Sequence, residues 1–150
     1  MQNTELNFNR MVDLSDLVSA IANAMCTNAI SIWHPGDDRA EHDIIVTTEN
    51  PGGEFPLLVS ITDLHASEPL SVSQVRQIAQ ILRSIILTDS IDTDIAPLYD
   101  DGYTMIGPDG SIDVVRADES GLEVGQLNLT AESRQRYLLA VSRLPQVVTV

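Results

Sequence analysis

Apolar residues recur at helical or strand spacing along this chain, and the pattern predicts most of its secondary structure. A first helix is predicted over residues 13–26, because five apolar side chains share one helical face there: Leu14, Leu17, Val18, Ile21 and Met25. Three short apolar runs then predict strands over residues 29–33, 43–48 and 56–62. The loop ENPGGEF between the last two has strong turn chemistry.

Alternation along these three strands divides their side chains between two faces. One face is assigned to the core and carries Ile30, Ile32, Ile44, Val46, Leu57, Val59 and Ile61. The opposite face carries three large apolar residues among hydroxyl side chains: Trp33, Ile45 and Leu58, with Ser31, Thr47, Ser60 and Thr62. This outer face is more apolar than a simple solvated sheet requires.

A second helix is predicted from Ser71, which has capping-box spacing to Gln74. Its apolar stripe consists of Val75, Ile78, Leu82, Ile85 and Ile86. Ile81 and Leu87 widen that stripe beyond what one core face needs. We therefore expect a helix that is deeply buried or forms half of a dimer interface, with Ile81, Ile85 and Leu87 as the contact residues.

The rest of the chain predicts a hairpin and a last helix. The strands YTMIG and SIDVVR flank Pro108-Asp109-Gly110, which suits a tight turn. The segment LNL (127–129) predicts a further short strand, and Thr130 caps a helix that Pro145 ends. The predicted order is α-β-β-β-α-β-β-α. It indicates a two-layer α+β domain, with a mostly antiparallel sheet and helices on one face.

The length indicates one domain, residues 1–150, with a core over about 13–144 and short tails at both ends. A single cysteine, Cys26, excludes an internal disulfide and favours a reducing compartment. No apolar run approaches the roughly 20 residues of a membrane span. The N-terminal segment has no basic stretch followed by an apolar one, so no secretory signal is predicted. We expect a cytoplasmic protein.

Of all the compositional features, the charge of the chain restricts its possible functions most. The chain has 22 acidic residues against 8 basic ones, a formal net charge of −14, and every basic residue is arginine. Direct binding to a nucleic-acid backbone is not expected, because it needs a basic surface. Without lysine there is no Schiff-base or P-loop lysine. The acidity is consistent with a solvated surface, with a high-salt cytoplasm, or with an inhibitor or viral accessory protein that mimics a polyanion.

A metal site is one interpretation of the stretch HPGDDRAEHD. If the first three strands form an antiparallel meander, His34, His42, Asp43 and His65 gather at one end of the sheet, near Asp63. Imidazoles and carboxylates are ligands for zinc, iron or manganese. No HxH or HExxH spacing fixes two imidazoles on one rigid element, so a polar hairpin end explains the stretch better than a metal site does. A metal-dependent enzyme at this end is therefore an alternative function.

The outer apolar patch is defined as Trp33, Ile45, Leu58 and the nearby Phe55. One interpretation has the chain's own C-terminal tail, PQVVTV, or its second hairpin cover the patch. The other has an extended partner segment or a second subunit lie on it. The patch is the predicted partner-binding site.

The order of elements, the segment IIVTTENPGGEFPLLVSIT, the helix after it and the YTMIG–SIDVVR hairpin resemble the dimeric class I chaperones of type III secretion. The resemblance covers about residues 13–144. It implies a homodimer that binds an extended segment of another protein, with no cofactor and no catalysis. Where that family often has a leucine pair and a small-polar pair, this chain reads ILRSIILTDS. The expected function is therefore a non-enzymatic, chaperone- or adaptor-like protein-binding module.

Overall fold

One seven-stranded sheet organises the residues that the computed structural model describes, namely 2–27, 30–32, 44–89, 102–118 and 126–144. The strand order across the sheet is β2-β3-β4-β1-β5-β6-β7. In chain order the strands are β1 (Gln2–Phe8), β2 (Ile30–Ile32), β3 (Ile44–Glu49), β4 (Leu57–Asp63), β5 (Ile86–Thr88), β6 (Gly102–Ile106) and β7 (Ile112–Arg116). All pairings among them are antiparallel except that of β2 with β3. The predicted α+β class with a mostly antiparallel sheet is confirmed.

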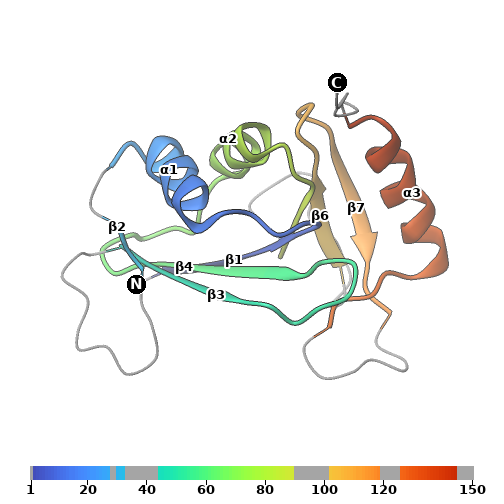
Figure 1. The fold of residues 1–150 in the computed structure, drawn as a ribbon, viewed down its shortest axis with the longest axis horizontal. Helices are drawn as coiled ribbons and strands as arrows, with labels where there is room; N and C mark the ends of the chain where they lie inside the picture. Colours follow the sequence, from blue (N-terminus) through green and yellow to red (C-terminus); the bar gives the residue numbers. More distant parts are fainter. Residues whose placement is uncertain (1, 28–29, 33–43, 90–101, 119–125, 145–150) are drawn as a thin grey trace.

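Three helices accompany the sheet in the described segments: α1 (Leu14–Met25), α2 (Val72–Leu82) and α3 (Ala131–Ser142). Helices α1 and α2 lie side by side on one face, above strands β1, β3 and β4 (Figure 1). Helix α3 lies at the other end of the sheet, beside β7 (Figure 1). The predicted helix starts are confirmed, since Asp13, Ser71 and Thr130 are the N-cap residues and Ser71 forms the expected capping box with Gln74.

Strand β1 is the element that the sequence patterns above did not assign. It lies in the middle of the sheet, paired with β4 along residues 2–8 and with β5 along residues 6–8. Its side chains alternate, with Thr4, Leu6 and Phe8 buried on the helix side. Residues 2–8 are therefore a central strand of the sheet that contributes Leu6 and Phe8 to the core, and not a tail.

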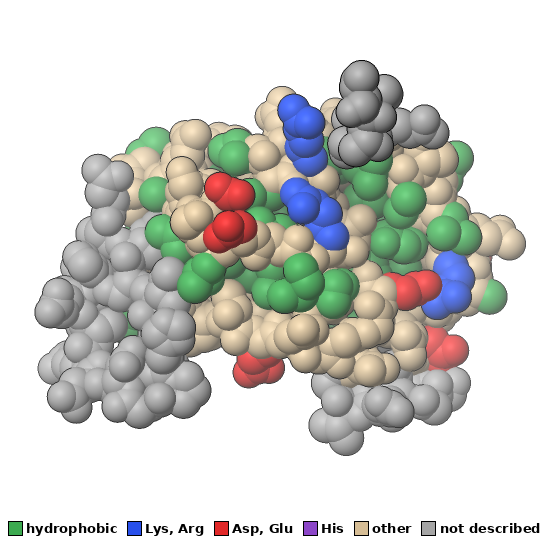
Figure 2. Space-filling model, viewed as in Figure 1, with side chains coloured by type: hydrophobic (Ala, Val, Ile, Leu, Met, Phe, Trp, Pro, Cys, Tyr) green, Lys and Arg blue, Asp and Glu red, His purple; other side chains and the backbone are tan. Residues whose placement is uncertain are grey.

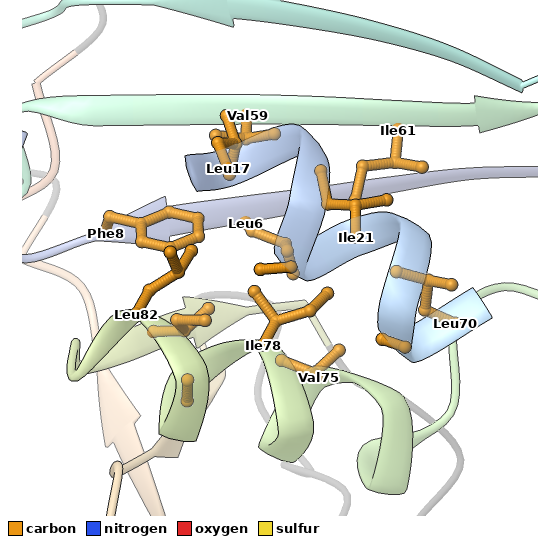
Figure 3. Packing of buried hydrophobic residues seen from close by; sticks show 14 of the residues in the cluster. Leu6, Phe8, Leu17, Ile21, Val59, Ile61, Leu70, Val75, Ile78 and Leu82 are labelled. Carbon is orange, nitrogen blue, oxygen red and sulfur yellow. The ribbon is translucent and has the colours of Figure 1, made fainter. Parts of the chain in front are cut away.

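The main core fills the space between this half of the sheet and the two helices. Leu6 and Phe8 of β1 meet side chains from α1, α2 and β4 (Figure 3). Many of these side chains are completely inaccessible to solvent. Each fully buried leucine, isoleucine or phenylalanine contributes about 1.5–3 kcal/mol by removal from water.

A second core lies on the opposite face of strands β5 to β7. Adjacent residues on a strand point to opposite faces, so Leu87 and Met105 belong to this core while Ile86 and Ile106 belong to the main one. Helix α3 adds Tyr137, whose ring lies 5.1 Å from that of Phe55 between centroids. Burial raises the pKa of the Tyr137 phenol, and a hydrogen bond with the Asn9 side chain partly opposes that rise.

Helix α2 is shorter than predicted. It ends at Leu82, because Arg83 adopts the left-handed conformation (φ 49°) that closes a helix C-terminus. The chain then enters the sheet as β5, and the backbone N–H of Ile85 donates to the Asn9 side chain at 2.9 Å. Ile85, Ile86 and Leu87 therefore lie off the helix, and the predictions that Ile85 and Ile86 belong to its apolar stripe and that Leu87 widens it are wrong.

The first three predicted strands do not form an antiparallel meander. Strand β2 runs parallel to β3, with Ile30 opposite Ile44 and Ile32 opposite Val46. The antiparallel β3–β4 pair matches the prediction, with Ile44 opposite Asp63. The end of β2 consequently lies beside Val46 and not beside the start of β3.

The capping box at α2 allows a direct test. The Ser71 hydroxyl accepts from the Gln74 N–H at 3.2 Å, while the Gln74 side chain accepts from the Ser71 N–H at 2.9 Å. Replacing Ser71 with alanine is expected to lower the free energy of unfolding by about 1 kcal/mol, because a helix N–H loses its partner. Urea denaturation measures the change, with Ser73→Ala, in the exposed first turn of the same helix, as the control.

Candidate functional site: the open face of the sheet

Strands β3, β4 and β1 have one face covered by α1 and α2, while their other face points away from these helices (Figure 1). Every side chain on that open face is exposed or half-buried. They form three rows across the strands: Ile45, Thr62 and Asn3; Thr47, Ser60 and Glu5; Glu49, Leu58 and Asn7. The open face therefore has small polar side chains at its centre.

Hydrogen bonds hold the polar centre in place. The hydroxyls of Ser60 and Thr62 both donate to the Asn3 side-chain oxygen, at 2.7 and 3.1 Å. The Asn7 amide donates to the backbone oxygen of Leu87 at 3.2 Å. These contacts orient the side chains of β1 before any ligand arrives, which reduces the entropy lost on binding.

Strand β1 is also incompletely paired along one edge. Its pairing with β5 stops at Leu6, opposite Thr88, so within the described chain residues 2–5 have a strand neighbour only on the β4 side. The Thr88 hydroxyl donates to the backbone oxygen of Glu5 at 2.9 Å, which shows that Glu5 directs its backbone toward the open edge. Asn3, two residues away, directs its N–H and C=O to the same side.

A hollow of about 370 Å³ lies at this free edge of β1, and its lining is Gln2, Asn3, Thr4, Glu5, Pro69, Thr88 and Asp89. The lining contains two carboxylates and no arginine. Within the described chain no strand pairs with the backbone groups of Asn3 on this side, so another extended chain can pair with them. Chemically, the hollow can accept an extended peptide and favours one that carries positive charge.

The far edge of the sheet is different, because α3 occupies it. The Ser133 hydroxyl accepts from the Arg116 N–H at 2.8 Å, and the Arg136 guanidinium donates to the Val114 oxygen at 3.2 Å. The Thr130 N–H donates to the Arg116 oxygen at 3.0 Å. Capped in this way, β7 presents few free backbone groups to another strand.

The predicted partner-binding residues are separated by the structure. Ile45 and Leu58 lie on the open face as expected, but two rows apart, roughly 13 Å along the strands. Phe55 is completely buried in the second core, so its assignment to a surface patch is wrong. Trp33 lies outside the described residues.

The three predicted dimer residues differ in burial. Ile85 and Leu87 are completely buried in the second core, so they cannot form a dimer surface while the domain is folded. Ile81 remains on α2 with 46% of its surface exposed. Of the three residues, Ile81 alone is available to a partner.

Of the predicted metal ligands, His65 is described and exposed, whereas His34, His42 and Asp43 lie outside the described residues. The backbone N–H of His65 donates to the Asp63 carboxylate at 3.0 Å. Within the described segments, no group of three or more histidine, cysteine, aspartate or glutamate side chains is arranged to hold a metal ion. The parallel β2–β3 pairing removes the meander on which the predicted gathering of histidines depended.

Comparisons with known proteins complete the description of the site. No family model, curated protein or solved structure matches the chain. The resemblance to type III secretion chaperones therefore stays a prediction. Among the described helices, none is both long and apolar enough to cross a membrane.

The open edge of β1 is the feature that sequence reasoning missed. The signal was present in QNTELNF, which alternates polar and buried positions at strand spacing. Threonine and asparagine make that alternation weak, because only Leu6 and Phe8 in it are large and apolar. No local pattern indicates that the pairing of β5 with β1 covers only residues 6–8 in the described chain.

Proposed function

We propose that this protein is a protein-binding module that holds an extended segment of another protein on the open face of its sheet and along the free edge of β1. The observation that carries the proposal is the edge of β1 at residues 2–5, which within the described chain have a strand neighbour only on the β4 side, beside a hollow of about 370 Å³. Extended peptides commonly bind by adding a strand to such an edge, with main-chain hydrogen bonds supplying affinity. An adaptor or chaperone fits this mode of binding.

The side chains around the edge support the same proposal. A strand added beside β1 would continue two rows, that of Asn3 with Thr62 and Ile45 and that of Glu5 with Ser60 and Thr47. Its alternate residues would face either this open surface or the Thr4 and Pro69 side of the hollow. Ile45 and Leu58 would supply apolar contact at two separate points, while the small polar residues between them would tolerate many sequences.

The test uses a proline at the free edge. Asn3→Pro removes an N–H that points away from β4, so the pairing of β1 with β4 is retained while an added strand loses a hydrogen bond. We expect capture of the partner from the native source, quantified by mass spectrometry, to fall about tenfold or more. Asn3→Ser is the matched control, because it removes the same amide side chain and keeps the N–H.

A second variant tests the face. Ile45→Asp places a charge where an apolar contact is expected and should reduce capture while leaving thermal unfolding nearly unchanged, since Ile45 is only half-buried. Equal capture by Asn3→Pro, Ile45→Asp and Asn3→Ser would refute the proposal. If partner capture is the same for all three variants but weakens steeply with salt, the result would instead indicate an acidic surface that mimics a polyanion.

We also propose the compartment in which the protein works and the class of its partner. A formal charge of −14 disfavours a nucleic-acid partner, and one cysteine among 150 residues is consistent with the reducing cytoplasm. The proposed partner is a protein, and the proposed activity needs neither cofactor nor catalysis.

A further inference from the structure

The surface where the end of β1 meets the end of α2 has an unusual charge pattern. We define the helix-end surface as Arg10, Met11, Asp13, Asp16, Ile81 and Arg83. Each of these residues is exposed. Arg10 brings the two chain segments together, because its guanidinium donates to the Ser84 hydroxyl at 3.1 Å and also to the Leu82 backbone oxygen.

The arginines of this region differ from those elsewhere in the described chain. Arg134 pairs with Glu54, Arg136 pairs with Asp113, and Arg143 lies within electrostatic reach of Asp109. Arg10 and Arg83 have no carboxylate partner among the described residues. The same holds for Arg76, which lies on α2 seven residues before Arg83. In so acidic a protein, arginines that lack a carboxylate partner within the described chain and lie close together mark a surface that can pair with carboxylates of another molecule.

Acidic and apolar side chains lie on the same face of the molecule as these arginines. Asp13 caps α1 and Asp16 lies in its first turn, three and six residues beyond Arg10. Met11 and Ile81 are two of the exposed large apolar residues, at 50% and 46% exposure. Figure 2 shows acidic side chains over the start of α1 beside basic ones over the ends of α2 and β1, with hydrophobic side chains close to both.

We propose that the helix-end surface is the contact between two copies of this chain, related by a twofold axis. In such an interface one surface meets itself, so it must be self-complementary. An axis between the two charged groups places Asp13 and Asp16 of one copy opposite Arg10 and Arg83 of the other. Met11 and Ile81 then lie near the axis, where apolar contact contributes most.

Net charge explains why the contact forms here. Two chains of charge −14 repel each other, and most surfaces would bring acid against acid. The helix-end surface presents arginines that have no carboxylate partner among the described residues to the second copy, so the local attraction opposes the overall repulsion. A purely acidic ligand would pair with the arginines, but Asp13 and Asp16 would repel it.

This dimer leaves the proposed partner site free. The open face and α1–α2 lie on opposite sides of strands β3, β4 and β1 (Figure 1). The dimer contact therefore does not depend on the proposed function, and either can fail without the other.

A charge-swap experiment on the full chain tests the contact. Sedimentation equilibrium is measured at about 0.15 M salt for the wild type, Arg83→Glu, Asp16→Arg and the double variant. Each single swap is expected to weaken dimerisation about 10- to 100-fold, because the twofold axis repeats every lost pair. The double variant restores opposite charges across the contact and is expected to recover most of the affinity.

Two further variants complete the test. Ile81→Glu is expected to abolish the dimer, whereas Leu138→Glu, a similarly exposed apolar residue on α3, should leave it intact. Thermal unfolding by circular dichroism checks that each variant is folded. A wild type that stays monomeric at every concentration, or a double swap no better than its parents, overturns the proposal. A monomer that binds a polyglutamate peptide through Arg83 also overturns it and assigns the arginines to an acidic ligand.

Discussion

Replacing Phe8 with alanine is expected to lower the free energy of unfolding by about 3–5 kcal/mol. Phe8 is completely buried in the main core, on a strand held between β4 and β5. Removing its ring leaves a cavity that the surrounding strands and helices cannot fill without moving. Domains of this size have total stabilities of about 5–15 kcal/mol, so the variant would lose a large fraction of its stability.

Urea denaturation followed by circular dichroism measures this loss, and the midpoint of thermal unfolding should fall by roughly 10 °C. Glu5→Gln is the control in the same strand, because Glu5 is exposed and the change is expected to stay within about 0.5 kcal/mol. A small loss from Phe8→Ala would contradict the central position of β1.

Phe55→Ala is expected to cost about 3–5 kcal/mol as well, although Phe55 follows a loop rich in turn residues. Its ring is completely buried and contacts Tyr137 of α3, with 5.1 Å between the ring centroids. The loss combines a cavity with a lost aromatic pair, which itself contributes about 0.5–1.5 kcal/mol. The variant should loosen α3 from the sheet.

An independent readout accompanies this prediction. Burial raises the pKa of Tyr137, so admitting water beside its ring should move that pKa down toward 10.0, the ordinary value for tyrosine. Ultraviolet titration of the tyrosines measures this shift. Leu58→Ala is the control, since Leu58 is half-buried on the open face and should cost about 1 kcal/mol without changing the Tyr137 titration. Equal losses from both variants would indicate that Phe55 is a surface residue after all.

Much of the fold is predictable from local patterns. Helical spacing and N-cap residues located the starts of all three described helices, because a helix start depends on residues within one turn. Alternation placed Val46, Val59 and Ile61 in the core and Ile45 and Leu58 on the opposite face. Turn chemistry located the β6–β7 hairpin at Pro108-Asp109-Gly110.

The errors have a shared physical cause. Ile85, Ile86 and Leu87 continue a helical stripe in sequence, yet a left-handed Arg83 ends the helix and the strand that follows buries both of its faces. A strand buried on both faces shows no alternation, so its apolar run cannot be distinguished locally from a helix. Phe55 was misplaced for a related reason, since the core that buries it includes α3, some eighty residues later in the chain.

The sequence by itself determined the class of this protein: an acidic, lysine-free α+β domain whose helices, hairpin and core-facing positions follow from spacing and capping. Only the tertiary structure decided that β1 lies at the centre of the sheet, that β2 joins in parallel, and that among the described residues only β4 pairs with residues 2–5. Spacing and capping act between neighbours in the chain, so they can be read locally. Strand order and unpaired edges depend on which distant segments meet, and a local pattern does not contain that information.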